Sequence, residues 1–343
     1  MSFVTVATNV IERVPFPDAV TSAGISFLVD RTRRKLARNG SPSEADFARL
    51  MAQQPIAVRP DAANEQHYEV NSDFFGLALG PRRKYSCCLY RTPQDTLPIA
   101  EEHALAETAA HAGLTDGQDI LELGCGWGSL SLWMAERYPA SRITAVSNSH
   151  GQRIYIEGRA ADLGLNNLLV VTADMNDFSP DATFDRVVSV EMFEHMTNWQ
   201  SLLRRVYGWL RPDGRLFMHV FSHHSAPYLF DVADKEDWIA QHFFTGGIMP
   251  SHRLIRHVAE VFEVEDEWRW GGEHYARTAR DWLANFDRNE DAVARVLRDV
   301  YGAEAALWKR RWRLFFLATA GLFGHVGGSE WGVSHYRLRP LAR

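Results

Sequence analysis

A glycine-rich loop follows directly after an apolar stretch near the middle of the chain. Residues 120–123 are typical of a buried strand, and Gly124, Gly126 and Gly128 come next at alternating positions. Glycine allows tight turns and close approach of the backbone to a ligand, because it has no Cβ atom. The spacing matches neither the GxGxxG pattern of dinucleotide sites nor the GxxxxGK[ST] pattern of nucleotide phosphate sites. The loop predicts a site for a small ligand without a pyrophosphate, and a simple turn is the alternative.

An acid and an imidazole stand side by side after a second apolar stretch. Glu194 and His195 follow residues 188–192, which are expected to end a strand. A carboxylate next to an imidazole is suited to moving protons at a reacting group. The alternative interpretation is an acid at a helix N-terminus beside a buried histidine that is held by hydrogen bonds.

Alternating strands and helices are expected to hold both features in place. From about residue 99, short β-rich stretches alternate with helical ones, which indicates βαβ units and a parallel sheet. The expected strands cover residues 120–123, 143–147, 168–172, 186–190, 216–221, 261–270 and 331–338. Ligands in open α/β sheets bind at the carboxyl ends of the strands, where the glycine loop and Glu194 are expected.

The remaining parts of the chain have other sequence patterns than this alternation of strands and helices. Residues 1–60 have helical spacing of apolar side chains and form a predicted accessory segment. Residues 61–98 precede the core, which covers residues 99–343. Within the core the alternation lapses at about 222–260, an aromatic-rich stretch that is predicted to be an α-helical insertion covering the site.

Composition excludes several classes of protein. The chain has 37 Lys and Arg against 43 Asp and Glu, a net charge of −6, which disfavours nucleic acid as a partner. The N-terminus shows no signal-peptide pattern, and no apolar run approaches the roughly 20 residues that span a bilayer. The three cysteines lack metal or disulfide spacing, so we expect a cytoplasmic protein without a bound metal. The basic run at residues 31–38 is either a solvated helix face or a site of peripheral contact with anionic lipid head groups.

The glycine loop and its surroundings resemble motif I of the class I S-adenosylmethionine (SAM)-dependent methyltransferases. This resemblance implies a Rossmann-like fold, with a seven-stranded, mostly parallel sheet and helices on both faces. It places Gly124 and Gly126 beneath the methionine part of SAM and Glu122 near its α-amino group. Asp174 and Met175 fall where the family contacts adenine. S-adenosylhomocysteine (SAH) would be the product.

A narrower resemblance covers nearly the whole chain. Most class I methyltransferases end the second strand with an acid, but this chain has Ser147 and Asn148 there, with Gln152 soon after. The cyclopropane fatty acid synthases and the coclaurine N-methyltransferases share that pattern. Their cap over the SAM site is similar to residues 61–98, where Tyr68, Tyr85 and Ser86 match.

The two branches of this family imply different proton chemistry. In the N-methyltransferase branch, a pair matching Glu194 and His195 is assigned to neutralising an ammonium substrate. In cyclopropane synthases, residues matching Cys87, Glu194, His219 and Tyr275 hold bicarbonate as the base. A free cysteine is usually a small buried apolar residue, so a contribution from the backbone of Cys87 is favoured over one from its thiol.

The end of the chain, around residues 323–335, is more similar to the coclaurine N-methyltransferases. We therefore expect a SAM-dependent methyltransferase that acts on a small, partly aromatic amine. The alternative is methylenation or methylation of an unsaturated acyl lipid with bicarbonate as base. A third possibility is a SAM-binding scaffold without activity, because a fold does not guarantee chemistry.

Overall fold

The computed structural model describes residues 10–38, 42–58, 70 and 72–342. Its centre is a seven-stranded sheet in the order β3-β2-β1-β4-β5-β9-β8. Strands β3, β2, β1, β4 and β5 are parallel, and β9 runs antiparallel to both of its neighbours. The strands are β1 (Asp119–Leu123), β2 (Arg142–Ser147), β3 (Leu168–Thr172), β4 (Phe184–Val190), β5 (Leu210–His223), β8 (Phe262–Gly271) and β9 (Trp331–Pro340). The predicted sheet and fold class are confirmed.

Strand β5 begins earlier than the sequence predicts. The sequence Pro-Asp-Gly at residues 212–214 is typical of a turn, but these residues lie inside the strand, where the register against β4 shifts between Phe184 and Arg186. Proline has no N–H to donate, so it is found at such irregular positions in a sheet. Gly214 fits because a Cβ atom there would lie 2.9 Å from a side-chain carbon of Leu210.

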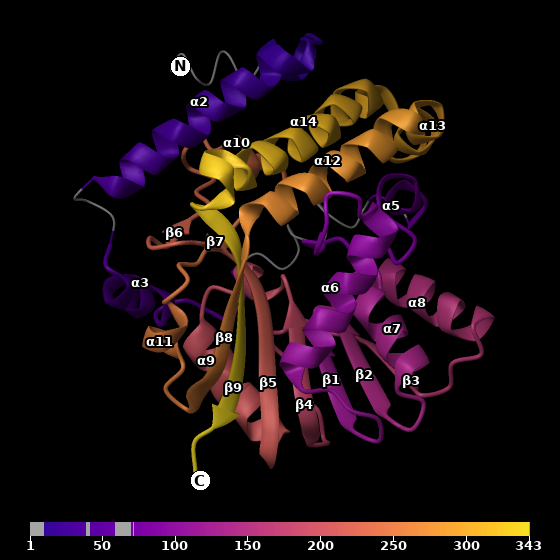
Figure 1. Ribbon diagram of the computed structural model, residues 1–343, viewed down its shortest axis with the longest axis vertical. Helices are drawn as coiled ribbons and strands as arrows, with labels where there is room; N and C mark the ends of the chain where they lie inside the picture. The colour runs from indigo at the N-terminus through magenta and orange to yellow at the C-terminus, as the bar shows by residue number, and fades with distance from the viewer. Residues whose placement is uncertain (1–9, 39–41, 59–69, 71, 343) are drawn as a thin grey trace.

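Helices cover both faces of the sheet because apolar side chains alternate along each strand. Ile120 packs with apolar residues of α6 and α7, whereas Leu121 and Leu123 pack with those of α9. Figure 1 shows these helices flanking the strands. They are α6 (Leu97–Ala112), α7 (Ser129–Arg137), α8 (His150–Asp162) and α9 (Trp199–Trp209), with the short helix η1 (Phe193–His195) after β4. No helix in the described part of the chain is long and apolar enough to cross a membrane.

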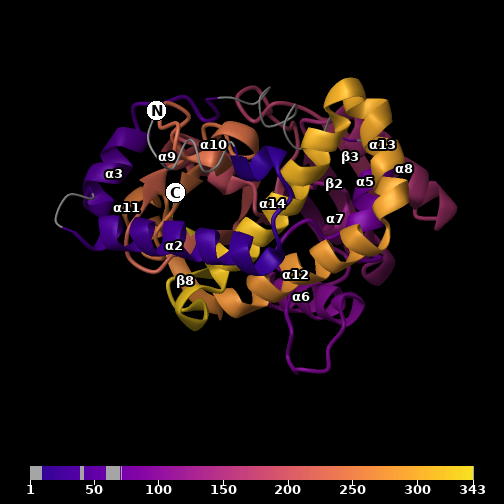
Figure 2. The same ribbon diagram turned by 90° about the horizontal axis from the view of Figure 1, so that it is seen from above.

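A second layer of helices lies above the carboxyl ends of the parallel strands (Figures 1 and 2). In α12, Tyr275, Ala279, Trp282 and Phe286 recur at helical spacing and are buried against this layer. Helix α2 lies along α14 on the outer side, as the contacts between them show. The layer consists of α2 (Asp18–Ala37), α5 (Ser72–Ala78), α12 (Gly272–Arg288), α13 (Glu290–Tyr301), η2 (Gly302–Glu304), α14 (Ala305–Phe323) and η3 (His325–Gly328), while α3 (Glu44–Met51) packs beside the sheet.

The predicted insertion contains helices and also a small ribbon that the sequence did not predict. Between β5 and β8 lie β6 (Tyr228–Leu229), α10 (Trp238–His242), β7 (Ile248–Met249) and α11 (Ile255–Val258). Strands β6 and β7 pair antiparallel as a separate two-stranded sheet. Figure 1 shows α10 and the ribbon at the end of the sheet where the helical layer sits.

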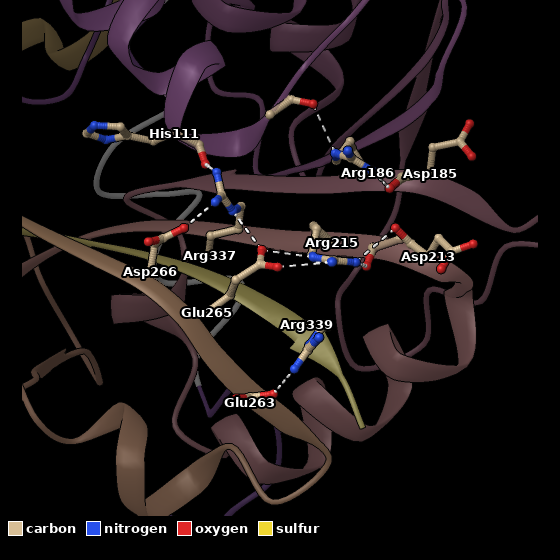
Figure 3. Close-up of polar contacts among 12 residues, drawn as sticks. His111, Asp185, Arg186, Asp213, Arg215, Glu263, Glu265, Asp266, Arg337 and Arg339 are labelled. Atoms are coloured by element: carbon tan, nitrogen blue, oxygen red, sulfur yellow. Dashed lines mark hydrogen bonds and ion pairs between the residues drawn. The ribbon is translucent and has the colours of Figure 1, made fainter. Parts of the chain in front are cut away.

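Ion pairs join the far ends of β5, β8 and β9 (Figure 3). Glu265 on β8 accepts hydrogen bonds from Arg215 Nε at 2.9 Å and from Arg337 Nε at 2.8 Å. Arg337 also pairs with Asp266 and donates to the carbonyl oxygen of His111 at 3.1 Å. The carboxylate of Glu265 therefore ties three strands together, and Arg337 adds the C-terminal end of α6.

Replacement of this carboxylate is expected to make the protein less stable in a pH-dependent way. The hydrogen bonds from Arg215, followed by those from Arg337, lower the pKa of Glu265 to about 2. A carboxyl with a lowered folded pKa stabilises the protein above its unfolded pKa, and that stabilisation is lost as pH falls toward 2. We expect Glu265→Gln to lower the melting temperature at pH 7 and the difference from wild type to shrink below pH 4.5. Glu263→Gln, which removes an exposed pair with Arg339, is the control with a smaller expected effect.

Candidate active site

The glycine loop turns at the carboxyl end of β1 as the sequence predicts. Gly124 has φ of 77° and Gly126 has φ of 52°, which is the left-handed region that favours glycine. A Cβ atom on Gly124 would lie 2.4 Å from the side chain of Met192, so this position is closed to larger residues. A Cβ atom on Gly126 would meet no atom within 4 Å. The backbone of Gly126 therefore borders open space.

That space is a pocket between the loop, α6 and the segment before it. Three of its polar atoms, Thr108 Oγ1, Trp127 Nε1 and Ser129 Oγ, are buried without a hydrogen-bond partner among the described residues. Buried polar groups normally have partners, so these atoms suit a polar ligand such as the methionine part of SAM. The predicted residues Tyr85, Ser86, Glu122, Gly124 and Gly126 all line the pocket, together with Arg83, Lys84, Leu105, Cys125, Leu130, Val190 and Glu191.

Glu122 is the buried acid of this pocket. Its carboxylate accepts a hydrogen bond from Ser131 Oγ, and burial raises its pKa to about 7. A cation bound beside it would favour the ionised form, because opposite charges attract more strongly away from water. The position is suited to an α-ammonium group.

We expect the affinity for SAM to depend on this ionisation. Below pH 7 the carboxyl of Glu122 takes up a proton and no longer attracts an ammonium group, so the Kd for SAM is expected to rise as pH falls from 8 to 6. In Glu122→Gln the affinity is expected to be weaker and nearly constant over that range. Calorimetric titration of SAM at several pH values measures both curves, and parallel slopes for the two proteins would contradict this role.

The predicted ribose and adenine residues lie at the ends of the next two strands. Ser147 Oγ donates to Gln152 Oε1 at 2.6 Å, and the Nε2 atom of Gln152 is buried without a partner among the described residues. Asn148 follows directly, and Asp174 follows β3, where Ala173 N–H donates to the carbonyl oxygen of Ser147. None of these residues lines the pocket around Glu122.

Two other predicted contacts stand apart from this group. Met175 is buried in the apolar core that includes Val146 and Met192. Tyr68 lies outside the residues that the structure describes.

Glu191 is the centre of a buried polar cluster that the sequence did not predict. It follows the last residue of β4 with φ of 48°. Its carboxylate accepts a hydrogen bond from Cys87 N–H at 2.9 Å and one from Tyr275 O–H at 2.6 Å, and it lies 3.1 Å from His219 Nε2. Three of the four residues predicted to hold bicarbonate are thus brought together, but around a carboxylate of the chain itself.

Glu194, the fourth member of the predicted set, has different partners. Its Oε1 atom accepts from Phe221 N–H at 2.6 Å, and its Oε2 atom is buried without a partner among the described residues. Burial raises the pKa of Glu194 well above its usual value, and the nearby Glu191 adds to that shift. The pKa of Glu191 is also raised by burial, against the opposing effects of Lys84, Cys87 N–H and Tyr275. We therefore assign the proton of the pair to Glu194 and the negative charge to Glu191.

The other members of this cluster are a neutral ring, a cysteine that donates through its backbone, and a buried lysine side chain. Burial lowers the pKa of His219 well below its usual value, so its ring is neutral. Burial also raises the pKa of the Cys87 thiol well above its usual value, and the Sγ atom contacts the carbonyl oxygen of Cys88. Lys84 is buried and donates to Ser86 Oγ at 2.5 Å and to the carbonyl oxygen of Cys87 at 2.7 Å. Its ammonium group holds in place the backbone that donates to Glu191.

Aromatic side chains of the insertion lie over the Glu194–His195 turn. The ring of His195 is 4.3 Å from that of Phe244, and Phe244 also contacts Phe221 and Phe230. Tyr228 O–H accepts a hydrogen bond from Trp331 Nε1 at 3.1 Å, which joins the ribbon to β9. The faces of these rings suit a partly aromatic cation.

One group of possible metal ligands occurs in the described part of the chain. Ligand atoms of His223, His224 and Glu330 all lie within 4.8 Å of one another. However, His223 Nδ1 accepts hydrogen bonds from the N–H groups of Ser225 and Ala226, so its proton is on Nε2. A protonated Nε2 facing Glu330 suits a hydrogen bond better than a metal.

Comparisons with known proteins show the family of this chain. The family model described as mycolic acid cyclopropane synthetase matches residues 57–326. The chain is 34% identical over 290 residues to (S)-coclaurine N-methyltransferase of Thalictrum flavum subsp. glaucum, covering 83% of this chain and 80% of that protein. It is 30% identical over 261 residues to cyclopropane-fatty-acyl-phospholipid synthase of Escherichia coli K12, covering 76% of this chain and 63% of that one. The crystal structure of a coclaurine N-methyltransferase bound to N-methylheliamine and SAH superposes with a TM-score of 0.92 at 30% identity, covering 98% of this chain and 100% of that one.

Proposed function

The chain belongs to the mycolic acid cyclopropane synthetase family and is a SAM-dependent methyltransferase, and from that premise we propose that its acceptor is the nitrogen of a small, alkaloid-like amine. The observation that carries the proposal is the buried carboxylate of Glu191, which contacts Cys87 N–H, His219 and Tyr275. Glu194 and His195 follow it in the next turn of the chain. The relative with 34% identity named above is an (S)-coclaurine N-methyltransferase, which by its name methylates a nitrogen.

In this proposal SAM lies along the glycine loop, with its methionine part in the pocket. Glu122 would hold the α-ammonium group, and Tyr85 and Ser86 line the same pocket. Gln152 and Asn148 hold the ribose, and Asp174 holds the adenine amine. When bound, SAM supplies an electrophilic methyl group on a sulfonium cation. The protein contributes mainly the alignment of the acceptor nitrogen behind that methyl group.

Glu191 handles the proton in this mechanism. An amine reacts only through its free lone pair, so an ammonium acceptor must first lose a proton. Glu191 takes that proton, since it carries the charge of the acid pair and lines the pocket. Glu194 and His195 orient the acceptor from the adjacent turn, with the rings of Phe244 and Phe230 against its aromatic part.

Bicarbonate is not required in this mechanism. The N–H of Cys87, the hydroxyl of Tyr275 and the ring of His219 already contact the carboxylate of Glu191. A second anion at the same place would lie against a buried negative charge, which is costly. We expect thorough removal of bicarbonate to leave the rate unchanged.

A lipid acceptor is the second candidate. It is favoured by the presence of Cys87, His219 and Tyr275 in one cluster and by the 30% identity to the bacterial synthase. In that case the helical layer and insertion would cover an acyl chain, and the basic residues 31–38 would face lipid head groups.

Mass spectrometry with methyl-labelled SAM separates the candidates. The purified protein is incubated with tetrahydroisoquinolines and anilines in one pool and with unsaturated phospholipids in another, with and without bicarbonate. We expect label on the amines in both conditions. Label in the acyl chains that depends on bicarbonate would overturn the proposal, and absence of any repeated turnover would favour a scaffold role.

A further inference from the structure

Three histidines form a continuous hydrogen-bonded chain behind Glu191. His219 Nε2 lies 3.1 Å from Glu191 Oε1, and His219 Nδ1 lies 2.9 Å from His335 Nε2. His335 Nδ1 lies 2.8 Å from His111 Nδ1, and His111 Nε2 lies 3.4 Å from Glu107 Oε1. The side chains of His219 and His335 are fully buried, whereas Glu107 is 32% exposed. The chain thus runs from Glu191, which lines the pocket, to a partly exposed carboxylate on α6.

The surroundings of the chain hold each ring in place. His111 stacks on Trp268 with ring centroids 3.8 Å apart, and Arg337 binds its carbonyl oxygen, as Figure 3 shows. The ring of His335 lies 4.4 Å from that of Trp270. These contacts fix the nitrogens that face one another.

We propose that His219, His335 and His111 form a proton relay through which Glu191 exchanges its proton with solvent while acceptor and SAM fill the pocket. The proposal rests on the proposed function for the source of the proton. It adds His335 and His111, to which the sequence analysis assigned no role, and Glu107 as the outer end.

The proton balance follows from the hydrogen-bond geometry. When Glu191 is protonated, its O–H donates to His219 Nε2, and the N–H groups of His219, His335 and His111 all point outward. Transfer of one proton along each bond leaves Glu191 as a carboxylate, keeps three neutral rings with N–H groups pointing inward, and releases one proton from His111 Nε2 to water at Glu107. The rings reset between turnovers in the reverse direction: one proton enters from water at His111 Nε2, one proton moves along each bond toward Glu191, and Glu191 releases the proton it receives to water in the empty pocket.

The charges around the relay are compatible with neutral rings. Burial lowers the pKa of His219 and His335 well below their usual value, and it lowers the pKa of His111 as well. Lys84 faces the inner end and opposes protonation there. At the outer end Glu107 and Asp266 favour protonation of His111, while Arg337 opposes it. A proton is therefore not trapped on the inner rings.

The test removes the outer ring and replaces it with a small molecule. His111→Ala cuts the relay near the surface, and we expect it to lower kcat for an alkyl ammonium acceptor by about tenfold or more, a loss within the usual contribution of acid–base catalysis. Added imidazole is expected to restore most of that rate. Methylation of an aniline, which is neutral at pH 7 and needs no prior deprotonation, is expected to stay near the wild-type rate. His257→Ala removes an exposed histidine outside the relay and serves as the control.

Each outcome decides the proposal. Equal losses with both acceptors, or no response to imidazole, would overturn the relay. If wild type methylates neither amine, the proposed function fails, and nitrogen NMR of labelled histidines then tests the relay alone. We expect either the inward set, with protons on Nε2 of His219 and His335 and on Nδ1 of His111, or the outward set, with protons on the opposite nitrogen of each ring. A mixed set, in which two N–H groups or two bare nitrogens face each other, would contradict the chain.

Discussion

Glu191→Gln is expected to lower kcat by about 10²–10⁴-fold, the range typical of a lost acid–base group, and to change SAM affinity little. The substitution keeps the size of the side chain but removes the negative charge that Cys87 N–H, Tyr275 and His219 surround. Without that charge an ammonium acceptor cannot be neutralised in the pocket. Steady-state rates with a tetrahydroisoquinoline, together with calorimetric binding of SAM, measure both effects.

Glu194→Gln is the matched comparison for this experiment. Because the proton of the acid pair is assigned to Glu194, replacing its carboxyl by a neutral amide should lower kcat much less than the same change at Glu191. A larger loss for Glu194→Gln than for Glu191→Gln would reverse the assignment.

Glu191→Ala offers a further test, since it leaves the three contacts of the carboxylate without their acceptor. Added formate or bicarbonate is expected to restore part of its activity.

Gly126→Leu is expected to weaken SAM binding by about 100-fold or more, which corresponds to at least ~2.7 kcal/mol. A side chain at this position would enter the pocket, because a Cβ atom on Gly126 meets nothing within 4 Å and the residue lines the cavity. The fold should persist, since a left-handed non-glycine residue costs only about 1–3 kcal/mol. Binding is measured by calorimetry and folding by thermal denaturation.

Gly164→Leu is the matched control for the loop. Gly164 also has positive φ, at 68°, and open space around its Cβ position, but it lies at the end of α8 and does not line the pocket. Both variants should lose similar stability, and only Gly126→Leu should lose SAM affinity. Equal binding by the two variants would place the cofactor elsewhere.

The sheet and the glycine loop could be predicted because their signals are local. Strands such as residues 143–147 and 168–172 are short apolar runs between turn residues, and the structure has them at Arg142–Ser147 and Leu168–Thr172. The bulge at residues 212–214 was interpreted as a turn, because Pro and Gly have the same local signature in both settings.

The centre of the active site could not be predicted from such signals. Glu191 gains its role from Cys87, His219 and Tyr275, which come from three segments 28 to 104 residues away. An acid directly after a strand was visible in the sequence, but Glu194, three residues later, matched the family motif. The pairing of His335 with His219 depends on the antiparallel register of β5 and β9, which the sequence does not specify.

The backbone of Glu191 has a consequence for the evolution of this enzyme. A non-glycine residue at φ of 48° carries about 1–3 kcal/mol of strain, and its buried charge adds to that cost. Glu191→Gly removes both, but it also leaves Cys87 N–H, Tyr275 O–H and the ring of His219 buried without their acceptor, and each such loss costs about 1–3 kcal/mol. Selection for heat resistance therefore has no single-step gain at this position, because the strained residue and its three partners would have to change together.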